Sequence, residues 1–168
     1  IVVNGGDDTV SIVKRPDNTV TMVAVGAAPV AVRHHITDGR AYVANSGAGT
    51  VSKVDTVAGA VTETLTVGAG PFAVAIDKGL NTIYVMNRGD NTVSMFNLNN
   101  GKTATINVGV TPVALAIDEQ VPMIFTANGG DNTISIIDYW KDNQVHNYQS
   151  LGQGVSKLTI DVDTGTIY

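Results

Sequence analysis

Thr92-Val93-Ser94 is one of four copies of the same triplet, a threonine, a branched aliphatic residue and a serine; the others are Thr9-Val10-Ser11, Thr50-Val51-Ser52 and Thr133-Ile134-Ser135. The copies start 41, 42 and 41 residues apart. A glycine after an aliphatic residue keeps nearly the same spacing, at Gly26, Gly68, Gly109 and Gly152. Self-similarity at this period, with strand-like content inside each unit, is typical of β-propeller blades.

The unit of residues 67–107 shows how one repeat divides into strands. Each apolar segment in it is short, and each break carries Gly, Asn, Asp or Pro. These segments predict strands over 71–76, 82–86, 93–97 and 102–108. The sequence therefore predicts an all-β protein, a β-propeller built of four-stranded antiparallel blades.

The chain holds four such units in a single predicted domain, residues 1–168. Three units are continuous, at 25–66, 67–107 and 108–150, and the fourth is divided between 1–24 and 151–168. Joining the two parts would close a four-blade ring, the low end of the usual range. Two alternatives stay open, because an open arc would leave sheet faces exposed. The chain is part of a longer propeller, or two copies form a homodimer that completes one ring.

The repeat resembles the YVTN family of β-propeller repeats. The residues that match are Tyr42-Val43-Ala44-Asn45, Tyr84-Val85-Met86-Asn87 and Phe125-Thr126-Ala127-Asn128, together with the Gly-Asp-Asn-Thr turns at 89–92 and 130–133. The resemblance implies the fold rather than one activity, because members of such a family do different things. It also implies a bacterial or archaeal protein that is secreted, periplasmic or on the cell surface.

The composition excludes several classes of function. A formal charge of −5 and a pI near 4.9 oppose the basic footprint that binding to nucleic acid needs. Because the chain has no cysteine, disulfides, thiolate nucleophiles, zinc–thiolate sites and iron–sulfur clusters are excluded. We see no targeting segment and no apolar run near about eighteen residues, so no membrane insertion is expected. No cofactor is expected either, since phosphate-binding glycine loops and His-x-x-x-His pairs are missing.

The sharpest departure from the repeat is Arg33-His34-His35, which stands where the other units have Ala-Ile-Asp or Thr-Ile-Asp. First strands line the channel of a propeller, so Arg33 and Lys157 would together hold an anionic group there. Two adjacent strand residues point to opposite faces, so at most one of the histidines can face a site. In the alternative interpretation His35 caps a turn in place of Asp, His34 is a core substitution, and Arg33 is solvated.

Two further groups are candidates for a site. Asp77, Asp118 and Asp161 recur once per unit and would offer oxygen ligands to a divalent ion, although an Asp after a strand also stabilises the next turn. Tyr139 and Trp140 occupy an outer hairpin, where exposed aromatic rings suit stacking on a sugar or a protein contact. The alternative is that Trp140 covers its own blade.

The sequence favours a non-enzymatic interaction or scaffold protein that binds a protein or glycan partner through loops on one face. The alternative is an enzyme, a hydrolase or lyase that acts on an anionic substrate at the channel mouth. In that case His34 or His35 would be the catalytic residue, with Arg33 and Lys157 as ligands of the substrate. A pH–rate profile governed by a histidine would distinguish the enzyme from the binding protein.

Overall fold

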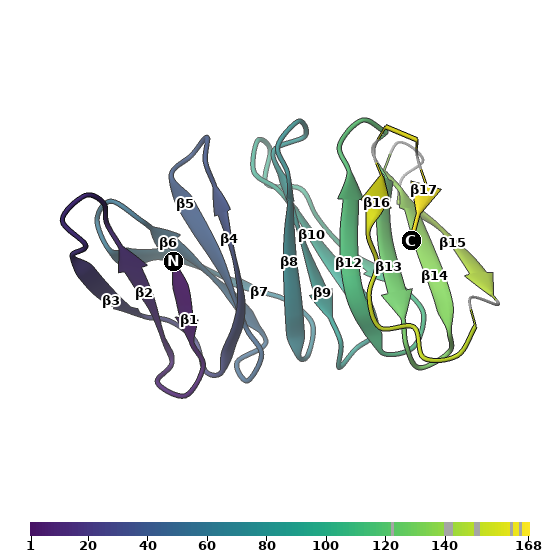
Figure 1. Cartoon of the computed structure of the whole chain (residues 1–168), viewed down its shortest axis with the longest axis horizontal. Coiled ribbons are helices and arrows are strands. Elements are labelled where there is room, and N and C mark those ends of the chain that lie inside the picture. Colours follow the sequence, from purple (N-terminus) through teal and green to yellow (C-terminus); the bar gives the residue numbers. More distant parts are fainter. Residues whose placement is uncertain (122, 140–142, 150–151, 162, 165) are drawn as a thin grey trace.

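The computed structural model describes residues 1–121, 123–139, 143–149, 152–161, 163–164 and 166–168, of which 147–149 are described by their backbone alone. The described strands form five separate antiparallel sheets. The sheets stand one beside the next, in sequence order, in a row (Figure 1). They are β-propeller blades, so the predicted fold class is confirmed.

Each continuous repeat forms one four-stranded blade. The blades are β4 (Pro29–His35), β5 (Arg40–Asn45), β6 (Thr50–Asp55) and β7 (Ala60–Thr66); β8 (Pro71–Asp77), β9 (Thr82–Asn87), β10 (Thr92–Asn97) and β11 (Thr103–Asn107); and β12 (Pro112–Asp118), β13 (Met123–Asn128), β14 (Thr133–Asp138) and β15 (Gln144–Gln149). The strands predicted for residues 67–107 agree with β8–β11 to within one residue at each end. The first strands β4, β8 and β12 contact one another in turn, so they lie along one side of the row.

The two parts of the divided unit do not form one sheet, in contrast to the prediction from sequence. Its first part forms a sheet of β1 (Val2–Asn4), β2 (Thr9–Val13) and β3 (Val20–Ala24), and its second part forms a sheet of β16 (Ile160–Asp161) and β17 (Thr166–Ile167). The two sheets lie at opposite ends of the row (Figure 1). Three blades stand between them, at roughly 10 Å per packed sheet, and the row does not bend far enough to bring its ends together. A single copy therefore does not form the four-blade ring.

The recurring triplet is explained by a hydrogen-bond pattern inside each sheet. An asparagine at the end of one strand donates, through Nδ2, to the threonine and the serine of the triplet on the next strand, at 2.8 to 3.0 Å. The donors are Asn4, Asn45, Asn87 and Asn128. A Cβ on Gly26, Gly68 or Gly109 would lie 2.4 to 2.8 Å from an atom of this asparagine or of a residue beside it, so only glycine fits there.

A second recurring pattern joins three of the sheets to the sheet that follows. Oδ1 of Asp8, Asn91 and Asn132 accepts a hydrogen bond from a backbone N–H of the segment that leads into the following sheet, at 2.7 to 3.1 Å. All three acceptor residues have a positive φ of 52° to 57°. Gly49 has a φ of 63° at the same point of the β4–β7 blade but brings no side chain. The repeated polar residues thus have structural roles.

The core consists of apolar layers between neighbouring sheets. One layer joins the β1–β3 sheet to the β4–β7 blade, a second joins the β4–β7 and β8–β11 blades, and a third joins the β8–β11 and β12–β15 blades. Each fully buried Val or Ile contributes roughly 1.5–3 kcal/mol relative to an exposed position. In the described part of the chain, no helix is long and apolar enough to span a membrane.

Candidate functional site

Arg33 and His34 lie at the exposed end of β4, and the neighbouring His35 is buried, with 3% of its surface exposed. The side chains of His34 and His35 thus lie on opposite faces, as expected of adjacent residues on a strand, and Arg33 is exposed as well. His34 is therefore not a core residue, contrary to the alternative interpretation of the sequence. Arg33 has no acidic partner among the described residues.

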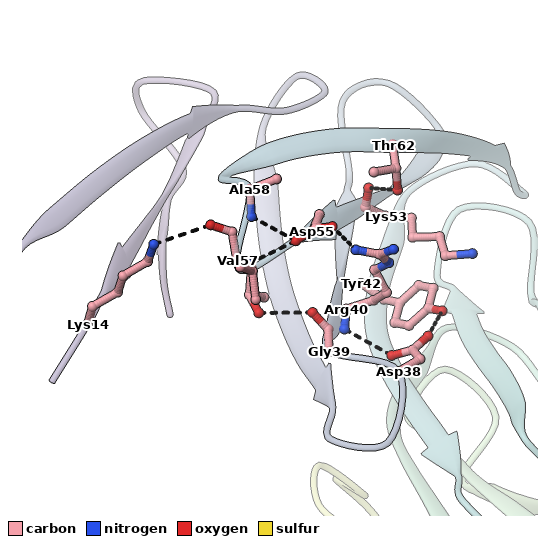
Figure 2. Close-up of polar contacts among 11 residues, drawn as sticks. Lys14, Asp38, Gly39, Arg40, Tyr42, Lys53, Asp55, Val57, Ala58 and Thr62 are labelled. Atoms are coloured by element: carbon pink, nitrogen blue, oxygen red, sulfur yellow. Dashed lines mark hydrogen bonds and ion pairs between the residues drawn. The ribbon is translucent and has the colours of Figure 1, made fainter.

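The two exposed residues line a hollow of about 500 Å³ between the β1–β3 sheet and the β4–β7 blade. Lys14, directly after β2, lines the same hollow, and its Nζ donates a hydrogen bond to the carbonyl oxygen of Val57 at 3.2 Å (Figure 2). The other lining residues are Ile1, Ile12, Val13, Val32 and Thr56. Apolar walls are thus combined with two cationic side chains and one histidine.

A polar network holds the turns beside this hollow (Figure 2). Asp38 accepts hydrogen bonds from the hydroxyl of Tyr42 and from the backbone N–H of Arg40, each at 2.9 Å. The guanidinium of Arg40 pairs with the carboxylate of Asp55, which also accepts the backbone N–H groups of Val57 and Ala58 at 2.9 and 2.8 Å. These bonds fix the turn that carries Val57, and Val57 in turn holds Lys14.

The pKa shifts in this network have plain physical causes. Burial, followed by the hydrogen bond to Asp38, raises the pKa of Tyr42 well above its usual range. The pKa of Asp55 is lowered, first by the backbone hydrogen bond from Ala58 and also by Arg40. Tyr42 therefore stays neutral and Asp55 stays ionised at neutral pH, so the network remains intact there.

The chemistry of the hollow is that of an anion-binding site. Arg and Lys form charge-assisted hydrogen bonds with carboxylate and phosphate groups. Catalysis through His34 would require a nucleophile or an orienting group within hydrogen-bond distance. Within the described ranges, His34 has no such hydrogen bond or ion pair.

His35 occupies the turn position that Asp holds in the other units. Its Nδ1 accepts the backbone N–H of Asp38 at 3.4 Å and lies 3.1 Å from Oδ1 of the same residue. Asp77, Asp118 and Asp161 make the equivalent contacts, each accepting one or two backbone N–H groups two or three residues later, at 2.9 to 3.3 Å. These contacts are turn caps. Among the residues that the structure describes, no group of three His, Cys, Asp or Glu could hold a metal ion.

The remaining sequence candidates lie apart from the hollow. Lys157 lines another hollow, of about 280 Å³, together with Val155, Leu158 and Ile167 near the β16–β17 sheet, at the far end of the row. The structure therefore does not bring Lys157 and Arg33 together in one copy. Tyr139 is partly buried against the apolar layer between the β8–β11 and β12–β15 blades. Trp140 lies outside the described residues.

Sequence reasoning missed Lys14. The residue follows a strand of a different sheet from that of Arg33, and a Lys-Arg pair directly after a strand is typical of a solvated turn. The repeat register is a signal that would have found it. Lys14 directly follows the third strand of its unit, and the first strand of the next unit ends at the same edge of the blades.

Comparison with solved structures shows the fold. The chain is similar to hydrazine synthase of Kuenenia stuttgartiensis, with 22% identity and a TM-score of 0.74 over 83% of this chain and 40% of that one. It is also similar to a streptogramin B lyase, with 14% identity and a TM-score of 0.77 over 95% of this chain and 54% of that one. A third similar structure is virginiamycin B lyase from Staphylococcus aureus, with 14% identity and a TM-score of 0.69 over 83% and 47%.

These structures contain β-propellers, in agreement with the blades described above. The chain spans 40% to 54% of the length of the three structures. No family model matches the sequence, and no curated protein matches it.

Proposed function

We propose that this chain is a non-enzymatic interaction module that binds an acidic protein partner in the hollow of Lys14, Arg33 and His34. The observation that carries the proposal is the contrast between two groups of polar residues. The repeated ones are used in hydrogen bonds that hold the blades, whereas these three depart from the repeat and line a hollow. A YVTN-type repeat and a place outside the cytoplasm belong to the same proposal.

An acidic protein segment fits the hollow for two reasons. The cations complement carboxylates, and the apolar walls at Ile12, Val13 and Val32 accept an aliphatic side chain next to the acidic one. The chain as a whole carries a charge of −5, so the hollow is a local exception that would orient an acidic partner. Charge pairs at the edge of an interface act mainly on association rate and specificity.

Fluorescence anisotropy with a labelled Glu-Glu-Leu-Glu-Glu-Leu peptide tests the proposal. At low ionic strength the native chain should bind, and the double variant Lys14→Ala, Arg33→Ala should bind about tenfold more weakly. Lys102→Ala removes one charge from an exposed turn far from the hollow and serves as the control. Equal binding by the native chain and the double variant would refute the proposal.

A lyase is the second candidate, and His34 is the observation that favours it. This histidine is exposed beside Arg33 in a hollow that can hold an anion, and two of the similar propeller structures are lyases. Under this proposal, turnover would follow a pH–rate profile governed by one histidine, and His34→Ala would abolish it. Peptide binding that is unchanged in His34→Ala, without turnover, would leave the interaction module as the function.

A further inference from the structure

A second recess lies in the wedge between the β4–β7 and β8–β11 blades. It consists of a hollow of about 620 Å³ beside Asp90 and Thr105 and a hollow of about 260 Å³ beside Lys53 and Glu63. Phe96 and Thr103 line both hollows, so the two form one groove. The groove shares no lining residue with the hollow of Lys14, Arg33 and His34, and it lies at neither end of the row.

The register of the outer strands explains what faces the groove. Phe96 pairs with Thr103 and Ser94 pairs with Thr105 across β10 and β11, so these four side chains share one face of the sheet. Phe96 packs against the apolar layer shared with the β4–β7 blade, so this face points toward that blade. The two threonines are exposed, and Thr103 lies directly opposite Phe96 on the neighbouring strand.

The groove opens around an aromatic ring at a position that is closed in the other two four-stranded blades. Val54 and Ile137 occupy this repeat position there and are both fully buried, whereas Val13 holds it in the β1–β3 sheet and is exposed. Phe96 is larger and remains partly exposed. On the other side of the β4–β7 blade, β3 packs against β7, and a Cβ on Gly59 would lie 2.9 Å from Thr21.

The polar groups of the groove are mostly neutral hydroxyls. Among the described residues, the side-chain hydroxyls of Thr103 and Thr105 have no hydrogen-bond partner. Asp90 accepts the backbone N–H of Ala69 through Oδ2 at 2.5 Å, and Oδ1 carries no such bond within the described ranges. At the other end, Lys53 is paired with Glu63 at 3.3 Å, so the groove offers no unpaired cation to an acidic ligand.

From this arrangement we propose that the groove binds a neutral oligosaccharide. The apolar face of a pyranose ring would lie on Phe96, where an aromatic side chain offers a broad apolar surface with defined geometry. Sugar hydroxyls would donate to Asp90 and exchange hydrogen bonds with Thr103 and Thr105. A largely apolar base with a few convergent polar groups is the usual form of a small-ligand site. The carboxylate of Asp90 disfavours a sugar acid.

Isothermal titration calorimetry with maltohexaose, cellohexaose, laminarihexaose and chitohexaose tests the proposal on the native chain. At least one of these probes should bind. Phe96→Ile keeps the core filled, because Ile is the residue at this position of the β12–β15 blade, and it should weaken binding roughly tenfold through the lost aromatic contact. The double variant Thr103→Val, Thr105→Val keeps shape and β propensity and should weaken binding several-fold.

Thr64→Val is the matched control, since Thr64 is an exposed threonine of β7 whose side chain, one residue before Leu65, lies on the opposite face of that sheet. Failure of all four probes to bind overturns the proposal, as does binding that Thr64→Val weakens as much as the groove variants. Thermal unfolding of each variant shows that loss of binding is not loss of fold. The acidic peptide reports on the Arg33 hollow separately, so the two proposals fail independently.

Discussion

Tyr42 and Tyr84 occupy the same repeat position and are both fully buried, but their hydroxyls have opposite surroundings. The hydroxyl of Tyr42 donates to Asp38 at 2.9 Å. Leu80 stands in place of Asp38 in the next blade, and the hydroxyl of Tyr84 has no hydrogen-bond partner among the described residues. Phe125 fills the position in the following blade. Removing the two hydroxyls should therefore have effects of opposite sign.

Tyr84→Phe removes a buried hydroxyl that makes no bond, and relief of its desolvation should raise the free energy of unfolding by about 1 kcal/mol. Tyr42→Phe removes a hydrogen bond to a charged group, an interaction of about 1.5–3 kcal/mol. Asp38 keeps the backbone N–H of Arg40 and partial access to water, so we expect a loss of about 1.5–2 kcal/mol, at the lower end of that range.

Urea unfolding followed by circular dichroism measures both changes, with the slope of the transition compared among variants to check that the same surface is exposed. The tyrosines belong to different apolar layers, so the double variant should show close to the sum of the two effects. A Tyr84→Phe variant that loses as much stability as Tyr42→Phe would refute the reasoning, since the hydroxyl of Tyr84 would then have a stabilising partner.

Three further changes test the repeat logic. Gly49→Asn should raise the free energy of unfolding by about 0.5–1.5 kcal/mol. The Oδ1 of the new asparagine would accept the backbone N–H of Gly70, as Oδ1 of Asn91 accepts that of Thr111. An unchanged urea midpoint would contradict this. Val85→Thr should lower the free energy of unfolding by less than about 0.5 kcal/mol, instead of the usual 1–3 for a buried hydroxyl. The reason is that the new hydroxyl would donate to the unpartnered Oδ1 of Asn87, as Thr126 donates to Asn128. A larger loss in urea unfolding would count against this prediction. Burial raises the pKa of both buried tyrosines, so the unfolded state releases their protons first and stability should fall as pH rises above about 10; a flat profile in the native chain between pH 9 and 11 would contradict this.

The anion-binding hollow shows which part of a site the sequence can predict. Arg33 and His34 stand out because they break a pattern that three other units keep. Lys14 also breaks the repeat, since Asp55, Asn97 and Asp138 hold its position in the other units, but the repeat alone does not place it beside Arg33. Its Nζ reaches Val57, 43 residues later in the chain, only because two sheets pack face to face.

Sequence alone determined the blade, because the interactions that define it are local. The alternation of apolar residues, the Asx and Gly turns, and the asparagine bonds to Thr and Ser five and seven residues later all lie within one repeat. Tertiary structure alone decided how the blades are placed. It left the two parts of the divided unit in separate sheets, put Lys157 far from Arg33, and opened the groove at Phe96. The physical reason is that these features depend on the packing of side chains between sheets, and a repeat that is nearly the same in every blade carries little information about it.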